Sequence, residues 1–243
     1  MPVNNPSYVM GEDVGPSLFV KQDTANDFQA LKATLGAEPL GVTHEGTRDA
    51  PIPGAAVLAA VAGESVRVYG LGEVCEVLVG SLAIVAGDHV APDANSKAQP
   101  AVHGFPYGGK ALAAAAASSK VRVAVERGVE DRSGTVLTKV ADYTLLLRDL
   151  GKTISTVGAA GTVVISLPAA VVGYEISAHV GAAQELRLDP NGMETIALPS
   201  TGVQGAAGKY LTANAAGETV QLKCNVSGTW DVMSFTGTWT SEA

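Results

Sequence analysis

Aromatic, cysteine and basic residues are all scarce in this sequence. Of its 243 residues, 5% are aromatic, two are cysteine, and 16 basic residues stand against 24 acidic ones, for a net charge of −8. An acidic chain has no general electrostatic attraction to nucleic acid, so direct nucleic-acid binding is not expected. The apolar content of 47% comes mainly from Ala, Val and Leu, and together with 28 glycines it suits many short strands joined by Gly-rich turns.

Long apolar runs and a signal-peptide pattern are also missing. The most apolar stretch, APIPGAAVLAAVAG, is interrupted by Pro and Gly and is shorter than the about 20 residues that span a bilayer, so no membrane segment is expected. The beginning, MPVNNPSYVM, lacks a basic region followed by an apolar core, so we expect no Sec export. Cys75 and Cys224 lie far apart without metal-ligand spacing, and we predict two buried free thiols.

Catalytic and metal-binding patterns are absent as well. No pair of the four histidines has a metal-ligand spacing, and there is no G-x-S-x-G elbow. The loop THEGTRDAP brings His44, Glu45, Arg48 and Asp49 together, either as an acid–base cluster or, as we prefer, as a polar turn or contact surface. We therefore predict a protein that is not an enzyme, with no catalytic residues, no cofactor and no metal.

One stretch, HGFPYGGKA, matches the phosphate-binding pattern G-x-x-x-x-G-K-[ST] except that Ala111 replaces the final hydroxyl residue. That loop needs a buried strand before it and a helix after it, and the surrounding sequence offers neither. We exclude nucleotide binding and predict a long connection between strands. Phe105 and Tyr107 would lie at its tip, where they suit contact with a neighbouring subunit.

A weak internal repeat bears on the residues that follow. LAAVAGESVRVYG and AAAAASSKVRVAV both place small residues and a polar turn before Val-Arg-Val, with an offset of 121 minus 66, or 55 residues. By analogy residues 111–117 would be a strand of a hairpin, whereas the helix propensity of alanine favours a short helix there.

The chain as a whole is predicted to be all-β. Residues 1–20, rich in Asn, Pro, Ser and Gly, would be an extended N-terminal arm, ordered against a partner or simply flexible. Residues 21–147 alternate short apolar runs with turn signals at intervals typical of an all-β domain, and residues 148–243 change in texture but again show alternating strands.

The two tryptophans, Trp230 and Trp239, lie in the last predicted strands. Exposed tryptophans stack on sugars, which leaves a carbohydrate-binding interpretation open. We favour the alternative, in which they fill the core near the closing strands of a sandwich.

The segments PLGVTHEGTRDAP, GESVRVYGLGEVCEVLVGSLAIVAGDHVAPDANSKAQPA and KVRVAVE resemble the capsid cement or decoration proteins of tailed bacteriophages. The shared theme is an apolar strand, a Gly-Asp turn, a second turn rich in Asp and small residues, and a closing Val-Arg-Val hairpin. Here its middle part is Ala86-Gly87-Asp88-His89-Val90 to Ala101; the usual Gly after the second Asp turn is replaced by DANSK, and the GFPYGG loop lengthens the next connection. Residues 148–243 resemble β-sandwich modules of phage head and tail surface proteins.

The resemblance implies a fold and a function. The fold would be a β-barrel-like or β-tulip domain followed by a C-terminal β-sandwich. The protein would be a homotrimer on the outer capsid surface of the virion, made in the host cytoplasm, where residues 21–147 bind and bridge major capsid subunits and residues 148–243 project outward. The alternative is a head or tail fibre or adhesion protein that recognises a host-surface glycan through Trp230, Trp239 or Tyr210.

Overall fold

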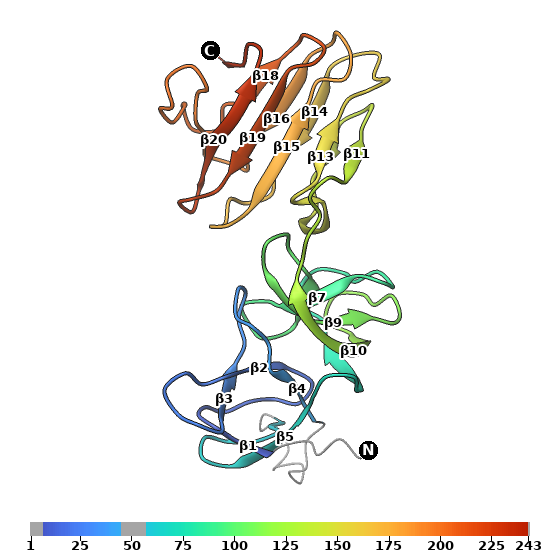
Figure 1. Cartoon of the computed structure of the whole chain (residues 1–243), viewed down its shortest axis with the longest axis vertical. Helices are drawn as coiled ribbons and strands as arrows, with labels where there is room; N and C mark the ends of the chain where they lie inside the picture. Colours follow the sequence, from blue (N-terminus) through green and yellow to red (C-terminus); the bar gives the residue numbers. More distant parts are fainter. Residues whose placement is uncertain (1–6, 45–56, 243) are drawn as a thin grey trace. The chain divides into compact units, whose positions relative to one another are not determined.

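The computed structural model describes residues 7–44 and 57–242, and Figure 1 shows the arrangement of the strands. The described residues form 21 strands and one short 3-10 turn, which confirms the all-β prediction. They divide into two compact units, the first comprising Met1–Ala101 and Phe105–Glu130 and the second Val102–Gly104 and Asp131–Ala243. No helix in the described ranges is long and apolar enough to cross a membrane.

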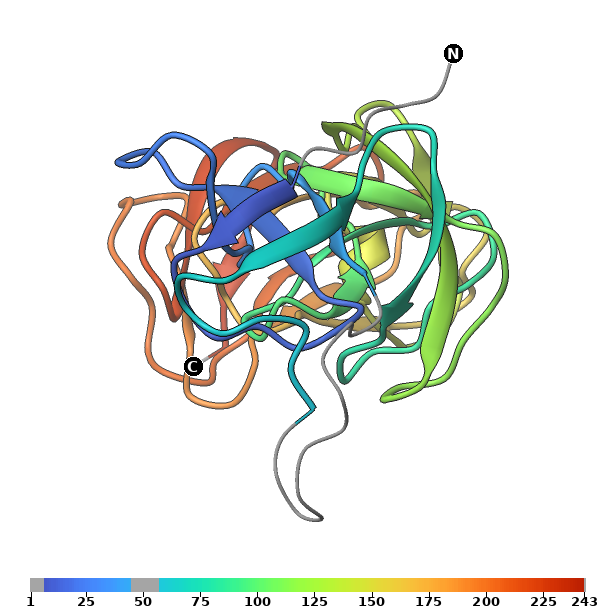
Figure 2. The same cartoon turned by 90° about the horizontal axis from the view of Figure 1, so that it is seen from below.

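The first five strands of unit 1 form a closed barrel in the order β1-β3-β2-β4-β5. They are β1 (Ser7–Met10), β2 (Phe19–Gln22), β3 (Gln29–Lys32), β4 (Gly41–Thr43) and β5 (Ser65–Tyr69). β1 pairs antiparallel with β5 and parallel with β3, and this closes the barrel. Seen from below in Figure 2, β1 in dark blue lies alongside β5 in teal.

Most of the predicted N-terminal arm therefore belongs to the barrel. Residues 1–6 lie outside the described part, but β1 supplies a wall strand, and Met10, Val14 and Phe19 are fully buried. These few apolar residues are spaced among Asn, Pro and Gly, which hides the strands from a composition argument. Three buried side chains are nevertheless enough to fix the segment against the barrel core.

The next five strands form a second sheet in the order β6-β10-β9-β7-β8. They are β6 (Val74–Leu78), β7 (His89–Pro92), β8 (Ala98–Pro100), β9 (Pro106–Ala111) and β10 (Lys120–Val129). A parallel bridge between Val79 and Ala98 joins the two edges of this sheet, as the parallel β1–β3 pair does in the first barrel. We call the two halves of unit 1 the first barrel and the second barrel.

The two barrels have the same strand pairing, and several individual backbone hydrogen bonds occur at equivalent positions in both. The Gly11 N–H donates to the Ala30 carbonyl at 3.0 Å, and the Gly80 N–H donates to the Ala98 carbonyl at 2.8 Å. The antiparallel bridge Val14–Ala60 of the first barrel returns as Ile84–Ala115 in the second. Unit 1 is thus a tandem repeat of one five-stranded module, and the Val-Arg-Val similarity seen in the sequence marks its last strand, β5 and β10.

The residues between β9 and β10 differ from both structures considered for 111–117. β9 ends at Ala111, and residues 112–119 are a connection whose single bridge is at Ala115. The predicted strand is displaced toward the N-terminus, because it is PYGGKA and not the alanine run that pairs with β10. The bridge to Ile84 holds Ala115 in an extended pairing, and bends and a turn flank it, so the alanine run does not form the helix that its propensity favours.

Each barrel has its own apolar core. The first core contains Met10, Val14, Val20, Ala30, Ala59, Ala60, Val66 and Val68. The second contains Cys75, Val77, Val79, Ile84, Val90, Ala98, Ala111, Val121, Val123 and Val125, joined by Phe19, Ala33 and Val42 of the first barrel. Three side chains from the first barrel thus complete the core of the second, and the two barrels pack against each other through them.

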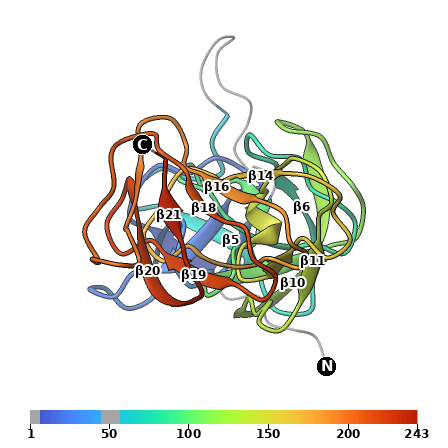
Figure 3. The same ribbon diagram turned by 90° about the horizontal axis from the view of Figure 1, so that it is seen from above.

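Unit 2 consists of two sheets whose strands alternate along the chain from β11 to β18 (Figures 1 and 3). The six-stranded sheet is β11 (Val136–Thr138), β13 (Thr153–Ser155), β15 (Glu175–His179), β19 (Thr219–Lys223), β20 (Thr229–Thr236) and β17 (Thr195–Ile196). The five-stranded sheet is β12 (Tyr143–Thr144), β14 (Val163–Ser166), β16 (Leu186–Asp189), β18 (Leu211–Ala213) and β21 (Thr240–Ser241). The 3-10 turn, η1 (Leu147–Asp149), follows β12.

The first six strands of unit 2 wind like a coil. β11, β13 and β15 are parallel neighbours in one sheet, and β12, β14 and β16 are parallel neighbours in the other. β19 and β18 then pair antiparallel with β15 and β16. Because β11 and β12 form the first turn of this coil, unit 2 begins at Asp131 and not at residue 148, where the change in sequence texture placed it.

Candidate functional site

The segment HGFPYGGKA is a strand with its connecting turn and has no phosphate-loop geometry. Pro106–Ala111 is β9, which pairs with β10 and β7. A Cβ added to Gly109 would collide with Val123 on the neighbouring strand, so the Gly-Gly pair serves close strand packing. The backbone N–H groups needed to cradle an anion are used here in a β-ladder.

Phe105 and Tyr107 are half-buried, so they do not form the exposed loop tip that we predicted. The Phe105 ring packs over Gly36 of the first barrel, where a Cβ would lie 3.5 Å from the ring. Tyr107 stacks on the His89 imidazole, with ring centroids 4.2 Å apart and planes 4° from parallel. Both rings are thus engaged inside unit 1.

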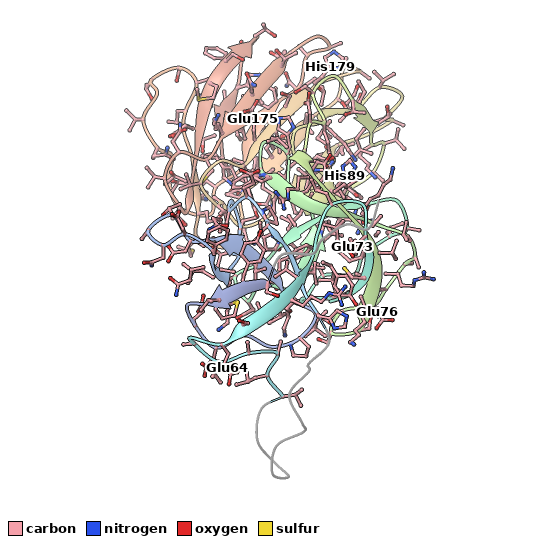
Figure 4. All side chains as sticks on the ribbon, turned by 60° about the horizontal axis from the view of Figure 1, so that its bottom comes forward. Glu64, Glu73, Glu76, His89, Glu175 and His179 are labelled. Carbon is pink, nitrogen blue, oxygen red and sulfur yellow. The ribbon has the colours of Figure 1, made fainter. Side chains whose placement is uncertain are left out.

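His89 lies between two carboxylates in the second barrel, and Figure 4 labels its position. Its Nδ1 lies 2.6 Å from a carboxylate oxygen of Glu130, and its Nε2 lies 3.3 Å from one of Glu126. The side chain of Glu130 is 10% exposed, so this pair is largely shielded from solvent. The cluster ties β7 to the end of β10, where the chain leaves unit 1.

β10 contains a bulge beside Glu126, the first of these two carboxylates. The pairing of β10 with β9 shifts register between Val125 and Gly128. An extra residue at a bulge re-aims the neighbouring side chains. Because of the bulge, strand alternation does not predict that Glu126 and Glu130 approach the same side chain, and no sequence pattern indicates their histidine partner on β7.

The cluster contains no activated nucleophile. Burial first, and then the charges of Glu126 and Glu130, raise the pKa of the Tyr107 hydroxyl, so it stays protonated at neutral pH. Among the described residues no group of three or more His, Cys, Asp or Glu side chains is arranged to hold a metal ion. The arrangement can hold two strands together, and we assign it that role.

The other histidines have different contacts. His44 stacks on Tyr69 with centroids 4.8 Å apart, while Glu45, Arg48 and Asp49, its proposed acid–base partners, lie outside the described residues. The Nδ1 of His103 accepts the Arg132 N–H at 3.0 Å. The Nδ1 of His179 lies 3.2 Å from the Ser155 hydroxyl. Each of these histidines therefore has a partner different from those of His89.

Both cysteines are free and buried, as predicted. Burial raises the pKa of the Cys75 thiol to about 12, and nearby Glu73 and Glu76 act in the same direction. Burial also raises the pKa of Cys224. A thiol that resists ionisation is a poor nucleophile and a poor metal ligand, so neither cysteine is a candidate for chemistry.

The tryptophans fill the interior of unit 2, which confirms the interpretation we favoured. Trp230 is fully buried, and Trp239 is 4% exposed with its Nε1 donating to the Thr236 carbonyl at 3.1 Å. Tyr210 is half-buried, and the Arg187 guanidinium lies 4.7 Å from its ring centre. Neither tryptophan offers a ring face for stacking on a sugar, and Tyr210 is already covered by a cation on one side.

Unit 1 carries an open hollow of about 400 Å³ that joins the two barrels. Its lining is Lys21, Gln22, Thr24, Ala37, Glu38, Pro39, Leu40 and Arg127. The Arg127 guanidinium donates to the Leu40 carbonyl, and this hydrogen bond connects β10 of the second barrel to a loop of the first. With cations and a carboxylate interspersed, this hollow has no convergent polar groups of one kind that would select a ligand.

Comparisons with known proteins find similarity to solved structures but not to family models or curated sequences. No protein-family model matches the chain, and no curated protein matches it. Among solved structures, it is similar to the head fiber gp8.5 N base in bacteriophage phi29, with 16% sequence identity and a TM-score of 0.38 over 52% of this chain and 97% of that one. A TM-score this low does not establish a shared fold, and the likeness carries no statement about function.

Proposed function

We propose that the protein is a structural component of a bacteriophage head that decorates and cements the outer capsid surface by bridging major capsid subunits. It acts as a homotrimer, without enzymatic activity, cofactor or nucleic-acid contact. In this proposal unit 1 attaches to the capsid, and unit 2 projects outward.

One observation carries the proposal. Part of the sequence that resembles capsid cement proteins, residues 74–101 and 120–126, folds within the second barrel, whereas SVRVY is β5 of the first barrel. Residues 86–101 form the Gly-Asp turn and the β7–β8 hairpin, and KVRVAVE forms most of β10. The resemblance therefore extends over both barrels, and its middle part coincides with the β7–β8 hairpin of the second barrel.

The packing of unit 1 is compatible with a clamp. The two barrels share core side chains, and the Phe19 N–H donates to the Ser96 carbonyl across them at 2.9 Å, so unit 1 resists distortion as one block. A rigid protein that binds only the assembled, strained shell stabilises that shell by mass action.

The test compares assembled capsids with and without the full-length protein. We expect co-sedimentation with capsids, saturation at a fixed ratio to capsid subunits, and greater resistance of the loaded capsids to heat. Unassembled capsid protein is the control, and it should not bind. Saturation without any gain in heat resistance would remove the cementing role and leave decoration, whereas failure to bind capsids would refute the proposal.

The alternative, a fibre or adhesion protein that binds a glycan, finds no support in the tryptophans. Both are buried, so only Tyr210 remains of the three residues considered for sugar stacking. A glycan array with the full-length protein decides between the two functions. Saturable binding that is lost in Tyr210→Ala would favour the adhesion function.

A further inference from the structure

The second barrel carries an uncharged apolar surface at one end. Two segments form it, Ser81 to Gly87 and Leu112 to Ser118, which we call the alanine face. Three hydrogen bonds hold them side by side: the Ile84 and Ala115 backbones exchange two, at 2.9 and 3.0 Å, and the Ser118 N–H donates to the Gly80 carbonyl at 3.0 Å. The face is therefore a fixed surface built on the bridge that closes this end of the barrel.

The side chains of the alanine face are exposed and apolar. Leu82 is 39%, Val85 47% and Leu112 50% exposed. The exposed alanines between them are Ala83, Ala86, Ala113, Ala114, Ala116 and Ala117. Neither segment contains a charged residue, although charged residues make up 16% of the chain. Contiguous exposed apolar surface of this kind marks an interaction site on soluble proteins.

The first barrel provides an internal control for this observation. At the matching end it carries three carboxylates, Glu12, Asp13 and Glu64, where the second barrel has Ser81, Leu82, Ala83 and Ser119. Two of these carboxylates accept backbone N–H groups of the adjoining segment, Asp13 from Ala62 at 3.0 Å and Glu64 from Val61 at 3.1 Å. The same fold therefore tolerates charge at this end, and its loss from the second barrel is not dictated by folding.

We propose that the alanine face pairs with the alanine face of a second copy of this chain. Contact between two copies related by a two-fold axis places the same patch against itself, so that patch must complement itself. An uncharged apolar patch does so, whereas a charged patch on a protein of net charge −8 would repel its copy. The two segments carry no charge with which they could attract an oppositely charged partner.

The small side chains also fit this arrangement. Alanines let two backbones approach closely, and the three larger residues supply most of the apolar area that is removed from water. A stable interface buries about 800 Å² on each partner, so the alanine face would be its apolar centre with polar residues around it. Asp88, at the border, already accepts the Val85 N–H at 2.9 Å.

This contact is separate from the proposed trimer and does not rest on capsid binding. Sedimentation of the free full-length protein tests it with Leu112→Glu and the matched control Val57→Glu. Val57 occupies the equivalent position in the first barrel, three residues before the bridging alanine, and is 60% exposed. We expect Leu112→Glu to have half the mass of the wild type, with pairing weakened at least about 10-fold by the buried carboxylate, and Val57→Glu to keep the full mass.

Two outcomes would overturn the pairing. One is equal mass for the wild type and Leu112→Glu, with both variants showing the thermal transition of the wild type. The other comes from Ala116→Cys under oxidising conditions, which should give a disulfide-linked pair because both native cysteines are buried. Absence of that cross-link in an associating protein would place the contact elsewhere. Capsid co-sedimentation of the same variants reports on the proposed function independently.

Discussion

The two barrels of unit 1 show how one strand arrangement accommodates two different sequences. Both have the parallel closure, the bridge at one end and the same hairpin order, yet Met10, Val14 and Val20 in the first core correspond to Val79, Ile84 and Val90 in the second. What the barrels share is backbone pairing and apolar character at the same points. The equivalent residues Phe19 and His89 differ in their contacts. Phe19 packs into the core of the second barrel, whereas the His89 ring lies between two carboxylates.

The largest difference in lost unfolding free energy between equivalent substitutions is expected at Phe19 and His89, which are the first residues of β2 and β7. Phe19 is fully buried in the second core, so Phe19→Ala should lower the free energy of unfolding of unit 1 by about 3–5 kcal/mol. His89 is half-buried and held by two carboxylates, so His89→Ala should cost less. Urea denaturation of the two variants compares them directly, and equal losses would contradict the unequal roles.

Similar losses of stability are expected when Gly41 and Gly109 are substituted. These two glycines pair with Val20 and Val90 on β2 and β7. An added Cβ would collide with the Tyr69 carbonyl oxygen and Val68 in the first barrel, and with Val123 in the second. Gly41→Ala and Gly109→Ala should each cost about 1–3 kcal/mol by overpacking. Thermal unfolding measures both changes. A neutral result for either one would show that the strands at that point separate easily.

Cys75 adds a pH dependence to the second barrel. Its pKa is raised in the folded protein to about 12 from an ordinary value of 9.0, so folding favours the protonated thiol. The stabilisation is complete below about pH 9 and is lost as pH rises toward 12. At pH 10 the loss should be about 1 kcal/mol. In Cys75→Ala this part of the pH dependence should vanish; an unchanged difference between pH 8 and pH 10 in urea denaturation would contradict it.

The smallest loss of stability is expected from substitutions in the turns after β2 and β7. The Asp93 carboxylate accepts the N–H groups of Asn95 and Lys97 at 2.7 and 2.9 Å, and the second of these bonds is partly buried. Asp23 accepts the Ala25 N–H at 2.9 Å and the Asn26 side-chain amide at 2.8 Å, both exposed. Asp93→Ala should cost about 1 kcal/mol, and Asp23→Ala should cost less because both of its bonds are exposed to solvent. Denaturation midpoints would show this order, and the reverse order would mean that the turns depend on other contacts.

Much of the fold could be predicted from alternation and turn residues, but the duplication could not be recognised in full. Val121 minus Val66 is 55, whereas His89 minus Phe19 is 70, so the two ends of the repeat lie at different offsets. The first barrel has a longer segment between β3 and β5, which shifts the register of any simple sequence comparison. Only the Val-Arg-Val strand was therefore visible as a repeat.

Contacts between distant strands account for the other differences. The sequence shows that Tyr107 and His89 are suited to polar contacts, but their stacking depends on the pairing of β7 with β9. The start of unit 2 was placed too late because β11 and β12 are short and weakly apolar, and only their parallel pairing assigns them to it. Burial of the cysteines and tryptophans was predictable, since apolar strands surround them.

The coil of unit 2 has two unlike ends. At one end the antiparallel strands β19 and β18 occupy the hydrogen-bonding edges of β15 and β16, so the parallel stack cannot grow further there. At the other end β11 and β12 are the outermost strands, but they are only three and two residues long. Edges this short give an incoming strand few backbone groups to pair with, which protects the protein against runaway strand-by-strand assembly at high local concentration.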